Sequence, residues 1–141
     1  QDAWCKCPSV NELAGLPSIL HSLKELYGRD PHPFQTLVFS TPTQQPAHSD
    51  HIHFSSIPNG FMCGVWVALE DVTSTNGPLF YFPGSHNLAY MNYHDLNITK
   101  NPAHEEAAYQ EYEARLEPLM LNLGFKKEVF LNVKPFFVVY F

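Results

Sequence analysis

The sequence predicts a mainly β domain with flanking helices, arranged as a sandwich or jelly roll. Three observations lead to this fold class. The 141 residues include 11 Phe and 7 Tyr, and aromatic side chains pack well on pleated surfaces. The apolar segments in the middle of the chain are short and separated by turn signals, whereas helical spacing is confined to the flanks. A doubly wound α/β fold would need helices between the central strands, and the sequence offers none there.

Residues 1–33 are predicted to form a helical N-terminal part. Ser9 and Glu12 have the spacing of a capping box, which opens a short helix. Pro17 suits the first turn of a second helix, and Gly28 is placed to end it. Apolar residues recur between them at helical spacing: Ile19, Leu20, Leu23, Leu26 and Tyr27.

Residues 34–97 are predicted to supply the core strands. The expected strands are Phe34–Ser40, Ala47–Phe54, Phe61–Leu69 and Leu79–Phe82. The third is apolar on both faces, which is typical of an interior strand. Asn76-Gly77 should form a tight turn, and Pro83-Gly84 should stop the strand before it.

Residues 98–124 are predicted to hold a helix, over Asn101–Leu121, that Gly124 can end. One side of it is largely apolar: Ala107, Ala108, Tyr112, Leu116, Leu119 and Met120. The other side is acidic: Glu105, Glu106, Glu113 and Glu117. Residues 125–141 should close a single domain with two strands, Glu128–Val133 and Phe136–Phe141.

Composition excludes several classes of protein. With a net charge of -6 and only 8 Lys and Arg residues, the chain is not expected to bind nucleic acid. Its longest apolar stretch, Phe136–Phe141, is too short to span a bilayer. Cys5 and Cys7 are too close for an easy disulfide and lack a second pair for zinc, so we expect reduced thiols and a cytoplasmic or otherwise intracellular protein. A chain that starts at Gln1 and stops at Phe141, inside an apolar run, is expected to be a truncated piece.

His48-Ser49-Asp50 is the candidate metal-binding motif. In an extended segment, residues i and i+2 project to the same face, so His48 and Asp50 can reach one ion together. They would supply two thirds of the two-histidine, one-carboxylate set that holds iron(II). The same periodicity would group His51 with His53, and spacing leaves that rival pair open.

Four segments in order resemble the phytanoyl-CoA dioxygenase family. They match its H-x-D strand, its W-x-A-L-x-D strand, its N-G-x-L turn and its P-G-S-H turn. The segments are Gln45–Asp50, Gly64–Val72, Asn76–Leu79 and Phe82–His86.

The resemblance implies a double-stranded β-helix that uses Fe(II) and the co-substrate 2-oxoglutarate. It implies that His48 and Asp50 are iron ligands, that Trp66 lies beside the co-substrate pocket, and that Gln45 is a weaker candidate for a polar contact there. His86 would belong to the turn. The implied function is a 2-oxoglutarate-dependent dioxygenase that hydroxylates a small-molecule or acyl-type metabolite with O2.

In the family, a distal histidine and an arginine that binds the co-substrate carboxylate follow a strand that would correspond to Val129–Phe141. The sequence contains no counterpart of either residue. Two protein ligands hold iron(II) less tightly than three, so we expect these 141 residues alone to show little or no enzymatic activity. One alternative is a non-catalytic jelly-roll binding module or inactive fragment. Another is a cupin-like metalloenzyme that uses several of His48, His51 and His53.

Overall fold

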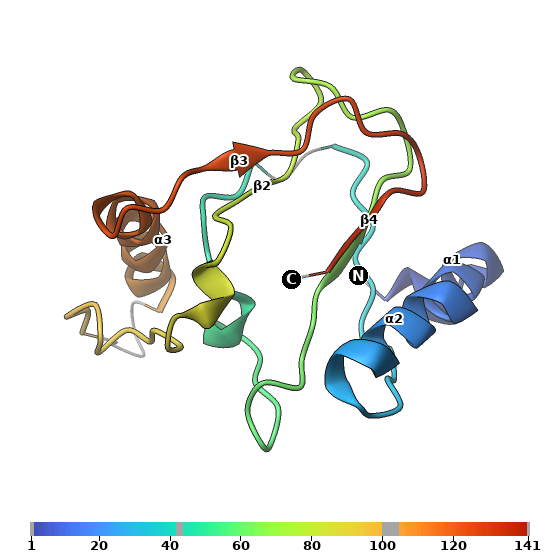
Figure 1. The fold of residues 1–141 in the computed structure, drawn as a ribbon, viewed down its shortest axis with the longest axis horizontal. Helices are drawn as coiled ribbons and strands as arrows, with labels where there is room; N and C mark the ends of the chain where they lie inside the picture. The colour runs from blue at the N-terminus through green and yellow to red at the C-terminus, as the bar shows by residue number, and fades with distance from the viewer. Residues whose placement is uncertain (1, 42–43, 100–104, 141) are drawn as a thin grey trace. The chain divides into compact units, whose positions relative to one another are not determined.

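The computed structural model describes residues 2–41, 44–99 and 105–140. The chain divides into two compact units, Gln1–Ser40 and Thr41–Phe141 (Figure 1). No described helix is both long enough and apolar enough to cross a membrane.

The first unit contains a 3-10 turn, η1 (Ala3–Cys5), and two helices, α1 (Pro8–Ala14) and α2 (Pro17–Tyr27). The prediction for α2 is confirmed at both ends, because Pro17 occupies its first turn and Gly28 follows it at φ 63°. The short first helix is also present. The predicted capping box is wrong, because α1 begins at Pro8 behind Cys7 and has no side-chain cap.

The segment after α2 does not form the predicted strand Phe34–Ser40. It is irregular and is tied to the start of the unit instead. The backbone N–H of Asp2 donates to the carbonyl of Thr36 at 2.6 Å, and the N–H of Trp4 donates to the Thr36 hydroxyl at 3.2 Å. A strand needs a ladder of such bonds along a partner. These contacts converge on Thr36 instead of forming a ladder, so the apolar residues of this segment do not by themselves produce a strand.

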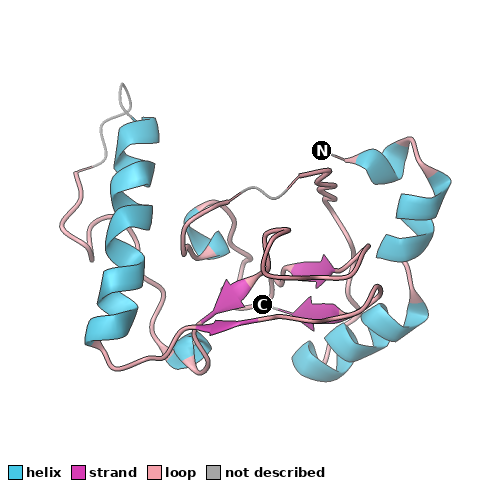
Figure 2. Ribbon diagram, turned by 90° about the horizontal axis from the view of Figure 1, so that it is seen from above, coloured by secondary structure: helices cyan, strands magenta, loops and turns pink. Residues whose placement is uncertain are grey.

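The β structure of the second unit is an interrupted antiparallel ribbon (Figure 2). Strand β1 (Val65–Val67) pairs with β4 (Val138–Tyr140), and β2 (Phe80–Tyr81) pairs with β3 (Glu128–Val129). An isolated bridge between Val72 and Val133 connects the two pairs. Each strand falls inside a range that the sequence predicted, but each is shorter.

The two sides of the ribbon change register where the 73–78 loop leaves it. Seven residues lie between Val72 and Phe80, whereas three lie between Val129 and Val133. Asn76 stabilises the loop: its Oδ1 accepts from the Thr73 N–H at 2.7 Å, and its Nδ2 donates to the Asp71 carbonyl at 2.8 Å. Gly77, next to Asn76 in this loop, has a φ of 71°, which fits the predicted tight turn.

Helix α3 (Glu105–Asn122) carries the core of this unit. Its buried residues recur every fourth position, so they form one stripe: Ala108, Tyr112, Leu116 and Met120. The stripe packs with Ala47, Phe82 and Ile98. The helix ends as predicted at Gly124, where φ is 88° and the N–H groups of Gly124 and Phe125 bond back to Leu121 and Met120 in a Schellman motif. The expected first residues, Asn101–His104, lie outside the described residues.

The described residues show helices and two small two-stranded sheets, and no jelly roll. The predicted mainly β body is therefore present only in part. A jelly roll needs two stacked sheets of several strands, whereas among the described strands each has one ladder partner.

Candidate functional site

The segment that carries the candidate ligands bends sharply rather than running as a strand. Asp50 begins a 3-10 turn, η2 (Asp50–Ile52), and the predicted strand Ala47–Phe54 is wrong. The N–H of Ile52 donates to the carbonyl of Ser49 at 3.2 Å. The N–H groups of His53 and Phe54 both donate to the carbonyl of Asp50, at 3.0 and 2.9 Å. These local bonds use the backbone groups that a strand partner would need.

The bend nevertheless brings the two candidate ligands together. His48 Nε2 lies 3.3 Å from Asp50 Oδ1. His48 Nδ1 lies 2.9 Å from the carbonyl oxygen of Pro46, which can only accept, so Nδ1 is the nitrogen that carries a proton in the neutral ring. The lone pair of that tautomer is on Nε2 and faces the carboxylate. The two atoms that could bind a metal ion, His48 Nε2 and Asp50 Oδ1, thus lie next to each other.

The electrostatics of this pair favour a positive charge between the side chains. Burial by itself would lower the pKa of His48. The hydrogen bond to Asp50, the bond to the Pro46 carbonyl, and the charges of Asp50 and Glu113 outweigh burial and raise the pKa above its ordinary value. A proton therefore binds more readily here than to a solvated imidazole, and a metal cation would compete for the same place.

The distance between the donors fits a shared metal ion. Two ligand atoms that each lie about 2.1 Å from a metal at right angles are about 3 Å apart, close to the observed 3.3 Å. The His48 side chain is 25% exposed and the Asp50 side chain 35%, so one side of the pair is open to further ligands. In residues 2–41, 44–99 and 105–140, no group of three or more His, Cys, Asp or Glu side chains is placed to hold one ion.

The two neighbouring histidines turn toward tyrosine rings. The His51 ring stacks on Tyr90 with centroids 4.0 Å apart, and the His53 ring packs against Tyr109 at 4.5 Å. The rival pair therefore has two different aromatic partners. His86 lies in η3 (Ser85–Asn87), the turn that Gly84 starts at φ 85°, where its side chain is exposed.

Gln45 and Trp66 lie on different segments. The amide nitrogen of Gln45 donates to the Tyr109 hydroxyl at 2.8 Å and to Glu113 Oε1 at 3.2 Å, so this residue is anchored on α3. Trp66 is half-buried in β1, opposite Val139 of β4.

The candidate ligands lie in residues 45–53, called here the ligand-bearing loop. The sequence did not single out the α3 residues that contact this loop. Tyr109 accepts a hydrogen bond from Gln45. Glu113, which was predicted on the acidic side of the helix, also accepts from Gln45 and helps to raise the pKa of His48. Their spacing of four residues, together with Tyr112 between them, was a usable signal, because such positions share one face of a helix.

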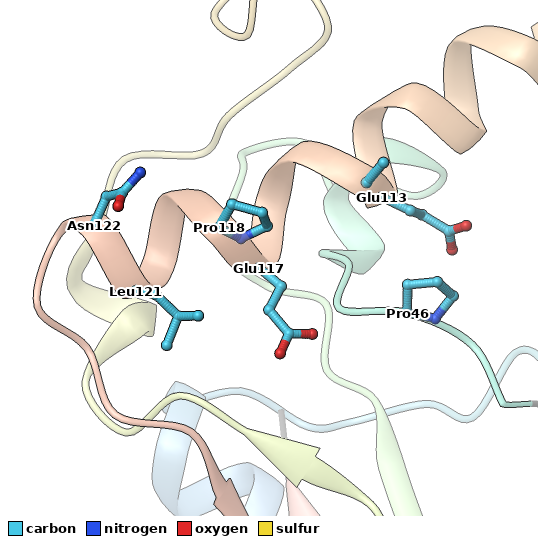
Figure 3. A pocket seen from close by; sticks show the side chains of 7 residues that line it. Pro46, Glu113, Glu117, Pro118, Leu121 and Asn122 are labelled. Atoms are coloured by element: carbon cyan, nitrogen blue, oxygen red, sulfur yellow. The ribbon is translucent and has the colours of Figure 1, made fainter.

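Two hollows flank the ligand-bearing loop. One, of about 550 Å³, lies between Pro46 and the side of α3 that carries Glu113, Glu117 and Pro118 (Figure 3). The other, of about 490 Å³, is lined by Ile52, His53, Tyr93, Glu105, Glu106 and Tyr109. Side chains on both sides of the loop are thus accessible to small molecules.

The chain belongs to the phytanoyl-CoA dioxygenase family, because the family model described as Phytanoyl-CoA dioxygenase (PhyH) matches residues 17–124. This is a family of iron- and 2-oxoglutarate-dependent oxygenases, so the resemblance drawn from four short motifs is confirmed.

Individual relatives are distant. The chain is 33% identical over 84 residues to "Phytanoyl-CoA dioxygenase domain-containing protein 1" of Danio rerio, and the matched region covers 57% of this chain and 29% of that protein. It is 24% identical over 134 residues to the Caenorhabditis elegans homolog of that protein, which covers 83% and 46%. A "Probable phytanoyl-CoA dioxygenase" of C. elegans is 28% identical over 89 residues, or 56% and 28%. The chain spans less than half the length of these relatives, and no solved structure matches it.

Proposed function

We propose that this chain carries part of the iron(II) site of a 2-oxoglutarate-dependent dioxygenase, with His48 and Asp50 as two of the metal ligands. The observation that carries the proposal is the approach of His48 Nε2 to Asp50 Oδ1, 3.3 Å apart, with the other ring nitrogen held by Pro46. Membership in the family supports both the metal and the co-substrate. In a complete site, the double-stranded β-helix of the family would supply the remaining strands.

The residues of this chain would bind and orient. Iron(II), when bound, would supply the oxidation chemistry: one oxygen atom of O2 would enter a substrate C–H bond, and the other would enter succinate as 2-oxoglutarate loses CO2. The Pro46 carbonyl accepts a hydrogen bond from His48 Nδ1, which would leave Nε2 to bind the ion, and the Asp50 carboxylate would offset part of the cation's charge. Trp66 would border the co-substrate, and Gln45, anchored on α3, would contribute a polar contact. The substrate would be a small-molecule or acyl-type metabolite.

The test measures binding of Co(II), a spectroscopically visible substitute for Fe(II), by calorimetry and visible absorption. We expect His48→Ala and Asp50→Ala each to weaken binding by at least about tenfold. His86→Ala removes an exposed histidine of the same type and should leave binding unchanged. Adding 2-oxoglutarate should tighten cobalt binding to the unmodified chain and shift its absorption.

The other outcomes discriminate the rival functions. Loss of cobalt in His51→Ala or His53→Ala as complete as in His48→Ala would favour the cupin-like metalloenzyme. A folded chain that binds no cobalt would favour the non-catalytic binding module. Either result would contradict the ligand assignment.

A further inference from the structure

Tyr109 of α3 contacts the ligand-bearing loop on both sides of the ligand pair. Before His48, the side-chain amide nitrogen of Gln45 donates to the Tyr109 hydroxyl at 2.8 Å. After Asp50, the ring of His53 packs on the Tyr109 ring, with centroids 4.5 Å apart and planes tilted by 58°. A single side chain of the helix therefore holds both ends of the segment that carries the two candidate ligands.

The core of the unit fixes the position of Tyr109. Its ring stacks with that of Tyr112, with centroids 6.3 Å apart and planes 17° apart. Tyr112 is fully buried, and Tyr109 packs against the cluster to which Tyr112 belongs. Because side chains in a close-packed core occupy defined rotamers, Tyr109 is a fixed support for the loop.

The loop needs such a support because its backbone bonds are local. The bonds that shape the bend join the N–H groups of residues 52–54 to carbonyls of residues 49 and 50, and none of the described strands includes the loop. Ala47 and Ile52 pack on the core, but apolar burial is non-directional. The hydrogen bond and the ring contact of Tyr109 are directional, so they fix the orientation of the loop as well as its place.

We infer that Tyr109 is a positioning residue for the metal site: through its hydroxyl and its ring, it holds both ends of the ligand-bearing loop so that His48 Nε2 and Asp50 Oδ1 stay side by side. The inference rests on the proposed metal-binding role of that pair. Ligands that are already held in place lose less conformational freedom when an ion binds, so Tyr109 contributes to metal affinity without touching the ion.

The role of the hydroxyl is tested by cobalt titration of Tyr109→Phe, which keeps the ring and removes the bond to Gln45. We expect cobalt affinity to fall about fivefold, which corresponds to one hydrogen bond of about 1 kcal/mol. Tyr81→Phe is the matched control, because the Tyr81 hydroxyl also makes a 2.8 Å bond, to Glu128 on β3; it should leave the affinity unchanged. In a Gln45→Ala background, Tyr109→Phe should cause no further loss, and an undiminished second loss would contradict action through Gln45.

The role of the ring is tested at His53. His53→Ala removes the contact with Tyr109, whereas His53→Phe keeps an aromatic ring there and removes both nitrogens. We expect cobalt affinity to fall in His53→Ala, by less than in His48→Ala, and to recover in His53→Phe. Equal losses in the two His53 variants would show that a nitrogen matters rather than the ring contact, and would overturn this half of the inference.

Hydrogen exchange without metal separates loop order from metal binding. The N–H groups of His53 and Phe54 donate to the Asp50 carbonyl, and we expect them to exchange about fivefold faster in Tyr109→Phe and at an unchanged rate in Tyr81→Phe. If the unmodified chain binds cobalt but Tyr109→Phe shows unchanged affinity, or lower affinity with unchanged exchange, the positioning role is wrong and the metal site stands. If the unmodified chain binds no cobalt, the metal site itself is wrong, and the role of Tyr109 is overturned with it.

Discussion

The hydrogen bonds from Gln45 to α3 can be tested by exchanging donor and acceptor. Gln45→Glu replaces the donating amide with a carboxylate and removes the bond to Glu113 Oε1, which measures 3.2 Å. The Tyr109 hydroxyl, 2.8 Å from the Gln45 amide nitrogen, can donate to the new carboxylate, so this bond is not counted as lost. The bond to Glu113 contributes about 1 kcal/mol. Two carboxylates about 4 Å apart repel by about 1 kcal/mol in water and more in a less polar setting. Because Gln45 is exposed, we take the value in water for the repulsion and expect a loss of about 2 kcal/mol.

The double variant Gln45→Glu with Glu113→Gln restores one donor and one acceptor with their positions exchanged. We expect it to recover at least half of the lost stability, which corresponds to a coupling free energy of about 1 kcal/mol or more. The assay is urea denaturation of the four proteins of the cycle. A coupling free energy below about 0.3 kcal/mol, the level at which independent sites simply add, would show that Gln45 is not held by Glu113.

Three further predictions concern pH, the core and the N-terminal unit. The raised pKa of His48 stabilises the metal-free fold at pH values below the unfolded pKa of about 6.5, and this contribution is lost as the pH rises through the folded pKa. Cobalt binds only the neutral ring, so the rise in melting temperature that cobalt causes should instead grow from about pH 6 to pH 8. A cobalt-induced rise that does not depend on pH would contradict ligation by His48. Leu116→Ala should destabilise the fold by about 2–4 kcal/mol in urea denaturation, because Leu116 is buried, whereas Leu121→Ala at an exposed position should cost less than about 1 kcal/mol. Equal losses of stability in the two variants would contradict the packing of α3. Gly28→Ala, at φ 63°, should destabilise the N-terminal unit by about 1 kcal/mol and leave cobalt affinity unchanged, and a neutral effect on melting would contradict the left-handed cap.

Helix α2 was predictable from the sequence because its limits depend on local chemistry. Pro17 is pre-shaped for a first helical turn and Gly28 tolerates the left-handed cap, so neither end needs help from distant residues. The start of α1 was missed by two residues, with the cap at Cys7 instead of Ser9, because two local signals competed. Pro8 at the first position displaced the expected cap at Ser9.

The strands were harder to predict because a strand depends on its partner. Phe34–Ser40 and Phe136–Phe141 are both rich in apolar residues, but among the described residues only the second segment supplies a strand, Val138–Tyr140, which pairs with β1. Likewise, period-2 reasoning placed His48 and Asp50 on one face of an extended segment. The two side chains do lie together, but a backbone bend at Asp50 brings them there, stabilised by bonds to the Ser49 and Asp50 carbonyls.

Local pattern analysis can place Tyr109 and Glu113 on one face of a helix, but it cannot show that this face contacts the ligand-bearing loop. Gln45 and Glu113 are 68 residues apart in the chain and meet through packing of α3. The same stripe of α3 that forms the core, with Tyr112 and Leu116, also borders the ligand-bearing loop through Ala47. Helix stability and metal affinity should therefore be linked. A ligand that binds only the folded loop stabilises the unit in proportion to the logarithm of its concentration over its dissociation constant. Any substitution that loosens α3 should then lower the apparent metal affinity without touching either ligand.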